Sequence, residues 1–368
     1  MNTPRKTPPS GPLTGIRIVE FAGIGPAPFA CMLLSDMGAD VIRVDRPGKT
    51  LGGPTDMIGR GRTTVLADLK DPATKEEVLA LLARADALVE GFRPGVMERL
   101  GLGPDVVAAR NPRLVYGRMT GWGQHGPLAQ AVGHDINYIS ITGALDAIGP
   151  AGGPPVPPLN LVGDYGGGSL YLALGIVSAL LEARTSGKGQ VVDAAITDGV
   201  LSLMTQFATQ SLRGSFREER GSNMLDGGAP YYGVYETLDA KHISIGPIEP
   251  QFFSEICERL DVSPALRGVQ QDRSRWPELR AEFARIFKTR SRGQWSEALD
   301  GTDACFAPVL PLSEARTHAH NVARQAFIDV EGVSHPAPAP RFSRTASAIQ
   351  GPAPSAAASF SDALSRWA

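Results

Sequence analysis

The chain has 368 residues, enough for one large or two ordinary domains, with 42% hydrophobic residues, 20% charged residues and a net charge of −2. It has no basic excess that would favour nucleic acid and no charge run that would favour a membrane surface. The three cysteines (Cys31, Cys257 and Cys305) have neither disulfide nor metal-ligand spacing, so we expect a cytoplasmic protein without a thiolate metal site.

The first half of the chain alternates between predicted strands and helices. We expect strands where β-branched and aliphatic residues cluster, and helices where apolar residues recur at helical spacing. The predicted strands are residues 16–21, 41–45, 63–69, 87–90, 114–119 and 190–195. The predicted helices are residues 28–37, 75–85 and an apolar stretch at 169–181, which is too short to span a bilayer. This alternation predicts an α/β domain with a Rossmann-like, open parallel sheet.

The first turn between a strand and a helix has a glycine pattern similar to that of dinucleotide-binding turns. Residues 23–28 read Gly-Ile-Gly-Pro-Ala-Pro, and Asp45 follows about twenty residues later. However, proline stands where the third glycine would be, and Pro26 and Pro28 lack the N–H groups that would hold a pyrophosphate. We therefore do not expect NAD to bind.

The second half of the chain has a different pattern. Short strands at 231–237 and 241–245 flank a turn, and helices follow at 251–260, 276–287 and 294–299. A helix at 199–213 is suited to connecting two bodies, and the chain after about residue 330 is rich in proline and alanine. We predict a large α/β domain at 1–198, a linker helix at 199–225, a small α+β domain at 226–328 and a return segment at 329–368 that packs on the large domain.

Two loops carry residues that can transfer protons. His134 lies in the first loop, and Asp164 precedes the triple glycine at 166–168 that opens the apolar helix. Chemistry at an acidic carbon needs such proton carriers, and free N–H groups at a helix start can hold developing negative charge. Taken alone, the two residues also fit a structural hydrogen-bonded pair.

Several cations follow predicted strands. Arg46 and Arg93 come directly after the second and fourth strands, and Lys70 is similarly placed after the third. The carboxyl ends of parallel strands form the ligand crevice, so these cations would suit a ligand with several phosphates; ordinary solvated side chains are the alternative.

Glu249 precedes a helix, either as a cap or as a carboxylate that orients an imidazole. No HExxH, GK[ST] or GxSxG motif is present, which gives no support to a metalloprotease, nucleotidase or esterase.

A family resemblance covers most of the chain. Segments 11–21, 38–44, 66–70, 93–96, 121–123 and 186–190 resemble the class III CoA-transferase superfamily. Within that superfamily, segments 133–138, 160–164, 227–232 and 248–252 are similar to the α-methylacyl-CoA racemases. Segment 59–62 departs from the commoner Asn-Arg pattern, so we expect no CoA contact there.

The resemblance implies an isomerase of fatty acid and lipid metabolism that epimerises the 2-methyl stereocentre of 2-methylacyl-CoA thioesters. Two bases would exchange protons through an enolate: these are His134 and Asp164, with Glu249 paired to His134 and Asp135 nearby. The residues implied on the CoA side are Arg46, Ala67, Lys70, Arg93 and Arg99, and those near the acyl group are Asn160 and Tyr232.

The resemblance also implies an interlocked homodimer whose site lies between the large domain of one subunit and the small domain of the other. Its partners would be an acyl-CoA thioester and a second copy of the chain, with no nucleic acid, membrane, metal or cofactor beyond the CoA of the substrate.

Two alternative functions remain open. A class III CoA-transferase would use Asp164 as a nucleophile and form an acyl-enzyme anhydride, without needing a second base such as His134. A CoA-binding module without activity would not need the proton carriers at all.

Overall fold

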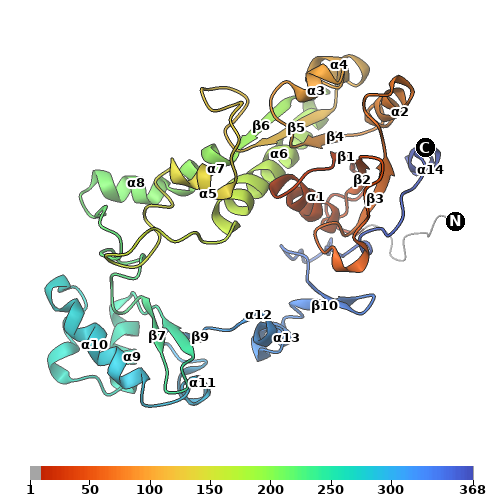
Figure 1. Cartoon of the computed structure of the whole chain (residues 1–368). Coiled ribbons are helices and arrows are strands. Elements are labelled where there is room, and N and C mark those ends of the chain that lie inside the picture. Colours follow the sequence, from red (N-terminus) through yellow and green to blue (C-terminus); the bar gives the residue numbers. More distant parts are fainter. Residues whose placement is uncertain (1–9, 368) are drawn as a thin grey trace. The chain divides into compact units, whose positions relative to one another are not determined.

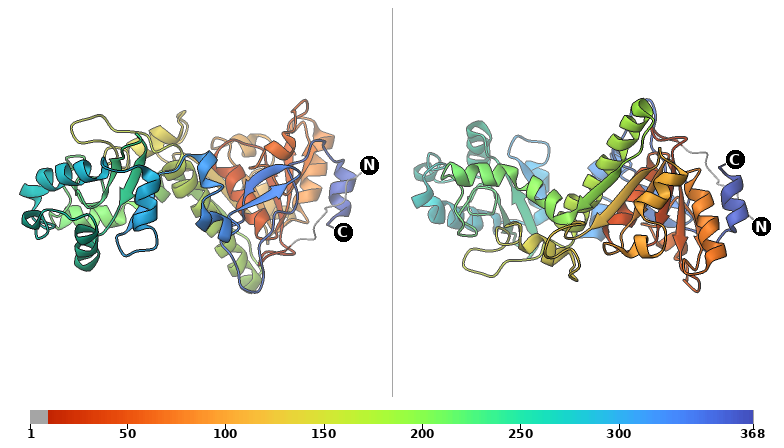
Figure 2. Two further views of the ribbon diagram at one scale, coloured as in Figure 1. Left: turned by 90° about the horizontal axis from the view of Figure 1, so that it is seen from below. Right: turned by 90° about the horizontal axis from the view of Figure 1, so that it is seen from above.

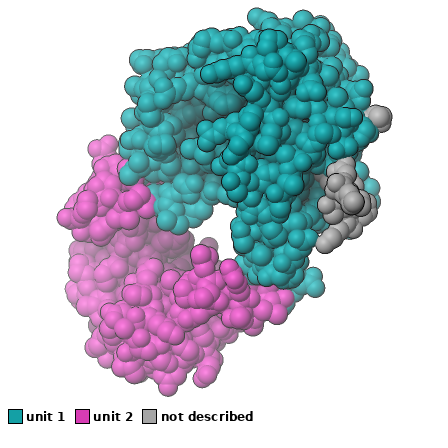
Figure 3. All heavy atoms as spheres, turned by 45° about the vertical axis from the view of Figure 1, so that its right-hand side comes forward, with its two compact units in different colours: residues 1–144, 158–205, 323–368 teal, residues 145–157, 206–322 magenta. Residues whose placement is uncertain are grey.

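The computed structural model describes residues 10–367, so residues 1–9 and 368 of the predicted large domain and return segment lie outside it. The chain divides into two compact units (Figure 3). Unit 1 comprises residues 1–144, 158–205 and 323–368, and unit 2 comprises residues 145–157 and 206–322. Segment 145–157, which we assigned to the large domain, belongs to unit 2.

Unit 1 is built on a six-stranded parallel sheet with the strand order β3-β2-β1-β4-β5-β6 (Figure 1). The predicted α/β class with an open parallel sheet is confirmed. The central strands are apolar on both faces because helices cover both sides. The strands are β1 (Arg17–Phe21), β2 (Asp40–Asp45), β3 (Arg62–Leu66), β4 (Ala87–Glu90), β5 (Val115–Thr120) and β6 (Val191–Ala195).

Two groups of helices accompany the sheet of unit 1. Helix α1 (Pro26–Asp36), the π-helix η2 (Leu161–Ser169), α6 (Leu170–Ser186) and α7 (Ile196–Leu203) pack against one another. Helices α2 (Pro72–Leu82) and α4 (Pro104–Arg110) share a hydrophobic core with alternate residues of the strands, including Val19, Phe21, Ile42 and Val44. Because side chains alternate across a strand, the intervening residues, such as Ile18 and Val41, face the other side of the sheet.

The helical stretch Leu161–Ser186 is longer than the apolar helix expected at 169–181. It comprises 26 residues, its most apolar 18-residue window has a mean hydropathy of 1.4, and by length and composition alone it is sufficient to cross a membrane. Half of this window is buried inside the protein. A helix in the core of a globular domain can have the same length and composition. The length argument against a membrane span therefore no longer holds, and the absence of a membrane partner stays a prediction.

Two arginines at the start of β3 are buried in ion pairs: Arg60 precedes the strand and Arg62 is its first residue. Arg60 Nη2 lies 2.5 Å from Asp36 Oδ2, and Arg62 Nε lies 2.9 Å from Glu20 Oε2. Arg60 also donates to the carbonyl of Pro336 at 2.8 Å. Removing one partner of a buried pair costs about 3–5 kcal/mol because the other charge is left uncompensated. These arginines therefore stabilise the fold, and the expectation that segment 59–62 makes no CoA contact stays a prediction.

The return segment runs along unit 1 from a hairpin to the C-terminal helix (Figure 2). The antiparallel hairpin consists of β10 (Phe327–Val330) and β11 (Val333–Pro336). Further on, the N–H of Ala358 donates to the carbonyl of Thr64 on β3 at 2.8 Å, and α14 (Phe360–Ser365) packs on α2.

Unit 2 contains a small antiparallel sheet covered by helices. Its strands are β7 (Gly233–Glu236), β8 (His242–Ile245) and β9 (Phe306–Pro308). Its principal helices are α9 (Pro250–Arg259), α10 (Trp276–Phe287) and α11 (Arg292–Leu299). Aromatic side chains fill the core: the ring of Phe287 lies 5.3 Å from that of Tyr235 and 5.2 Å from that of Trp295. The helix expected at 199–213 is divided into α7 and α8 (Thr205–Leu212).

Candidate active site

A cavity of about 510 Å³ lies at the carboxyl edge of the sheet in unit 1, and we call it the switch-point cavity. The loops after β1, β4, β5 and β6 line it. In the strand order of this sheet, β1 and β4 are neighbours and the connections leave them in opposite directions. Such a topological switch point is where open α/β sheets bind their ligands.

Asp164 lies in the π-helix η2, and its side chain lines this cavity. The amide of Asn160 donates to Asp164 Oδ2 at 3.2 Å. Burial raises the pKa of the Asp164 carboxyl, with a smaller contribution from the nearby Asp135 carboxylate, while the Asn160 hydrogen bond and the charge of His134 oppose the rise. A carboxyl with a raised pKa beside an imidazole suits proton transfer, and π-helical turns are frequent at functional sites.

Asp135 supports the backbone around Asp164. Its Oδ1 accepts a hydrogen bond from the N–H of Asp164 at 2.7 Å. Burial raises the pKa of Asp135, whereas the N–H groups of Asp164 and Gly163 lower it by stabilising the carboxylate. A side chain on Gly163 would place Cβ only 2.2 Å from Asp135 Oδ1, so glycine is required for this contact.

His134 immediately precedes α5 (Asp135–Ser140) and exposes its imidazole to the switch-point cavity. Its backbone N–H donates to Asn137 Oδ1 at 3.1 Å, which fixes the start of the helix. The hydroxyl of Tyr138 donates to the carbonyl of Gly133, and the Tyr138 ring lies edge-on to Trp122 at 4.8 Å between centroids. Packing and hydrogen bonds therefore hold the loop that carries His134.

The N-terminus of α1 also faces this cavity, through Gly25, Pro26 and Ala27. Gly25 has a φ of 67°, and a Cβ there would lie 3.0 Å from Asp164 Oδ2. In the sequence, Gly25 is recognisable only as part of a glycine turn like those that bind dinucleotides, so this contact with Asp164 was not predicted. The positive end of the α1 dipole can stabilise negative charge that develops next to Asp164.

The predicted CoA-side residues follow the same edge of the sheet. Arg93 lines the switch-point cavity together with His134 and Asp164. The others lie in or after the loops that leave β2, β3 and β4: Arg46, Ala67, Lys70 and Arg99. The side chains of the two arginines and the lysine are exposed, and Ala67 is buried. A row of exposed cations at this edge suits the phosphates of CoA.

Two predicted site residues belong to unit 2. Glu249 is exposed and immediately precedes α9, and Tyr232 is exposed beside a second cavity. The pairing of Glu249 with His134 stays a prediction. Within residues 10–367, no group of three or more His, Cys, Asp and Glu side chains is arranged to hold a metal ion.

Comparisons with known proteins agree on the family. The family model described as CoA-transferase family III matches residues 13–358. The chain is 43% identical to the alpha-methylacyl-CoA racemase of Mus musculus and 42% identical to that of Homo sapiens, in each case over 90% of this chain and 87% of the relative. Its fold is similar to the crystal structure of a CAIB/BAIF family protein from Brucella suis, with a TM-score of 0.82 and 24% identity over 97% of this chain and 99% of that one.

Proposed function

The chain belongs to CoA-transferase family III, and from this premise we propose that it is a racemase of 2-methylacyl-CoA thioesters. The observation that carries the proposal is that His134 and Asp164 line one cavity at the switch point of the sheet. The identity to two alpha-methylacyl-CoA racemases over most of both chains supports the same activity.

In the proposed reaction, the α-carbon of the thioester lies between the two proton carriers. The Asp164 carboxylate removes the α-proton, and the electron pair of the C–H bond forms the C=C bond of an enolate whose oxygen becomes negative. His134, as imidazolium, returns a proton to the opposite face, and the two residues have then exchanged protonation states. In the reverse direction, neutral His134 is the base and protonated Asp164 is the acid.

The surroundings of the two residues suit this chemistry. The raised pKa of Asp164 makes its protonated form accessible, which the reverse direction requires. The enolate oxygen would be stabilised by the positive end of α1, whose first turn lines the cavity. Asp135 holds the N–H of Asp164, so we assign Asp135 the role of positioning residue.

The remaining contacts of the proposed site follow from the family. Arg46, Lys70, Arg93 and Arg99 would bind the phosphates of CoA, and Ala67 would lie on the same side of the site as the CoA. Asn160 would hold Asp164 close to the acyl group, and Glu249 would favour the charged form of His134 by pairing with it.

The test is to incubate the enzyme with one epimer of a 2-methylacyl-CoA in deuterated water and to follow the α-proton by NMR. A racemase incorporates deuterium at the α-carbon and produces the other epimer. A CoA-transferase that uses Asp164 as a nucleophile gives neither change and instead requires an acceptor acid. Absence of both exchange and inversion, together with transfer of CoA to an added acid, would overturn the proposal in favour of the transferase.

A further inference from the structure

A network of charged side chains lies at the carboxyl edge of the sheet in unit 1, and we call it the Arg118 network. Arg118 is on β5, and only 8% of its side chain is exposed. Its Nε donates to Oε1 of Glu90, the fully buried last residue of β4, at 3.0 Å. Its Nη1 and Nη2 donate to Glu98 Oε1 at 2.8 Å and Oε2 at 3.3 Å. One guanidinium therefore joins two carboxylates.

The two carboxylates hold the segment that carries Arg93. Oε2 of Glu90 accepts a hydrogen bond from the N–H of Phe92 at 2.7 Å, immediately before Arg93. Glu98 belongs to the short helix α3 (Val96–Arg99), which follows Arg93. Between them, the N–H of Val96 donates to the carbonyl of Arg93 at 3.1 Å. The backbone is thus fixed on both sides of a cation that lines the switch-point cavity.

The same segment holds a second predicted CoA cation, Arg99. The turn before α3 contains Gly95, which has a φ of 83°. A Cβ at this position would lie 3.1 Å from Arg99 Nη1, so the guanidinium of Arg99 lies over the backbone of this turn. Any movement of segment 91–99 would therefore displace both exposed arginines together.

Carboxylates fix the backbone next to the other predicted CoA cations as well. After β2, Asp45 Oδ1 accepts a hydrogen bond from the N–H of Arg46 at 2.8 Å. After β3, Asp68 Oδ1 accepts one from the N–H of Lys70 at 3.0 Å. The contact that Glu90 makes after β4 is therefore the third of its kind along one edge of the sheet. A ligand with several phosphates needs its cations at fixed positions, which such contacts provide.

We propose that Glu90, Arg118 and Glu98 are positioning residues, which hold segment 91–99 so that Arg93 and Arg99 bind the phosphates of CoA. This inference rests on the proposed function, in which the two cations bind CoA. The hydrogen bonds from Arg118 lower the pKa of Glu98, and the charge of Arg99 lowers it further, so Glu98 is ionised at neutral pH. By charge alone, this carboxylate would repel the phosphates. What it contributes to binding is the position of the arginines.

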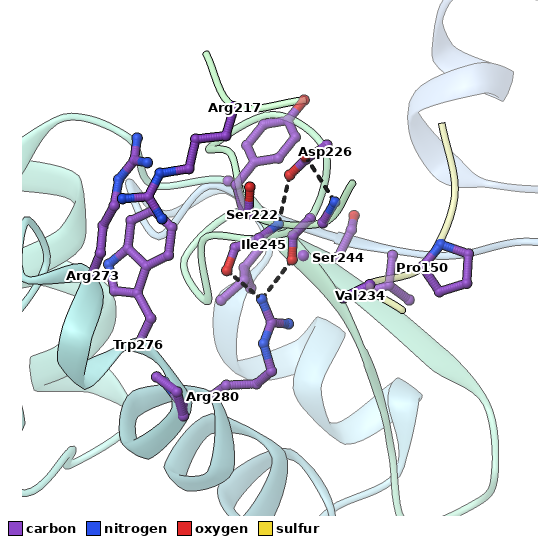
Figure 4. A pocket seen from close by; sticks show the side chains of 18 of the residues that line it. Pro150, Arg217, Ser222, Asp226, Val234, Ser244, Ile245, Arg273, Trp276 and Arg280 are labelled. Atoms are coloured by element: carbon purple, nitrogen blue, oxygen red, sulfur yellow. Dashed lines mark hydrogen bonds between the residues drawn. The ribbon is translucent and has the colours of Figure 1, made fainter. Parts of the chain in front are cut away.

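The alternative is that the network only stabilises a loop. Asp226 in unit 2 is a carboxylate of that kind, since it accepts hydrogen bonds from the N–H groups of Gly221 at 2.9 Å and Gly228 at 3.0 Å (Figure 4). None of the predicted CoA cations belongs to that loop. A purely structural carboxylate affects the melting temperature but leaves the KM of the folded enzyme unchanged.

The test variant is Glu98→Gln, because its side chain is 45% exposed and its loss leaves the buried Glu90 paired with Arg118. The Kd of CoA is measured by calorimetry, and kcat and KM are measured for epimerisation. We expect Kd and KM to rise by about fivefold to tenfold and kcat to stay within about twofold, because a weaker phosphate contact affects substrate and transition state equally. If Glu98 acted by charge alone, Kd and KM would fall instead.

The matched control is Glu76→Gln on α2. Its carboxylate also binds an arginine, with Arg110 Nη2 at 3.0 Å from Oε2, and no predicted CoA cation lies on that helix. We expect Kd and KM to stay as in the wild type. Circular dichroism checks that both variants fold. In an enzyme that already carries Arg93→Leu and Arg99→Leu, Glu98→Gln should have no further effect on Kd, because the residues that it positions are absent.

The outcomes separate this inference from the proposed function. A wild type that binds CoA but does not epimerise the thioester overturns the racemase proposal, and the Kd values still decide the positioning role. If the wild type epimerises the thioester and folded Glu98→Gln binds CoA as tightly as the wild type or more tightly, the positioning role is wrong and the racemase proposal stands. An undiminished effect of Glu98→Gln in the absence of Arg93 and Arg99 would also contradict the inference.

Discussion

Asp164 has a raised pKa chiefly because it is buried, and Asn160 is a neighbour whose hydrogen bond opposes the rise. The Asn160→Ala variant loses this bond to the carboxylate, so the pKa of Asp164 should rise further. In the direction in which Asp164 is the base, the acid limb of kcat/KM against pH should move to higher pH. In the opposite direction, Asp164 must start protonated, so the basic limb should also move to higher pH. Profiles that do not move in either direction would show that Asn160 does not control this carboxyl.

Glu249 is the proposed partner of the His134 imidazole. Glu249→Gln keeps the shape of the side chain and one hydrogen bond but loses the negative charge. Loss of a charge-assisted hydrogen bond should lower kcat by about one to two orders of magnitude, with a smaller change in KM. The control is Glu258→Gln, an exposed position on the same helix. Equal activity of the two variants would mean that Glu249 only begins a helix.

Some of these residue roles could be predicted from sequence and others could not. His134 lies at a helix start, as expected, whereas Asp164 lies in the first turn of η2 and not in a loop; both line one cavity. The role of Asp135 was not predictable, because the N–H group that it binds lies 29 residues further along the chain. Likewise, no local pattern indicates that Arg60 and Arg62 are buried against Asp36 and Glu20.

At the scale of elements, the π-helix η2 shapes the site. The Gly163→Ala variant would place a methyl group 2.2 Å from Asp135 Oδ1 and displace this carboxylate from the N–H of Asp164. A shift of about 1 Å at a catalytic group can cost roughly 100-fold in rate, and we expect a loss of that size in kcat. Gly23→Ala is the matched control in unit 1, since its Cβ would meet no atom within 4 Å. Circular dichroism and thermal melts check that both variants fold. Wild-type activity in a folded Gly163→Ala variant would contradict this account of η2.

The elements of the sheet were predictable because their sequence signal is strong. The central strands β1 and β4 are short, mostly apolar and buried, and all six strands lie within a few residues of their expected positions. The π-helix was not predicted, since a glycine-rich apolar segment has the same composition whether its hydrogen bonds span four or five residues. The β10–β11 hairpin was also missed, because it is short and lies at the boundary expected between the small domain and the return segment.

At the scale of the whole molecule, an exposed apolar face of α6 indicates that a second subunit covers it. Leu170, Leu174 and Leu181 are spaced to lie on one face of this helix, and 52%, 63% and 68% of their surfaces are exposed. Exposed apolar patches mark interaction sites, and the proposed homodimer would cover this one. We expect light scattering to give the mass of a dimer at micromolar concentration and Leu174→Glu to shift it towards the monomer. Val106→Glu, on α4, is the control and should remain dimeric. A wild-type monomer that is fully active would rule out the interlocked dimer.

The central claim is that two different residues transfer the proton on opposite faces of the α-carbon. The most direct measurement incubates His134→Ala and Asp164→Ala separately with each epimer in deuterated water and follows the α-proton by NMR. We predict that each variant exchanges the α-proton of one epimer only, with retention of configuration, and that both variants lose inversion. Inversion by either variant at a rate near that of the wild type would contradict the two-base account.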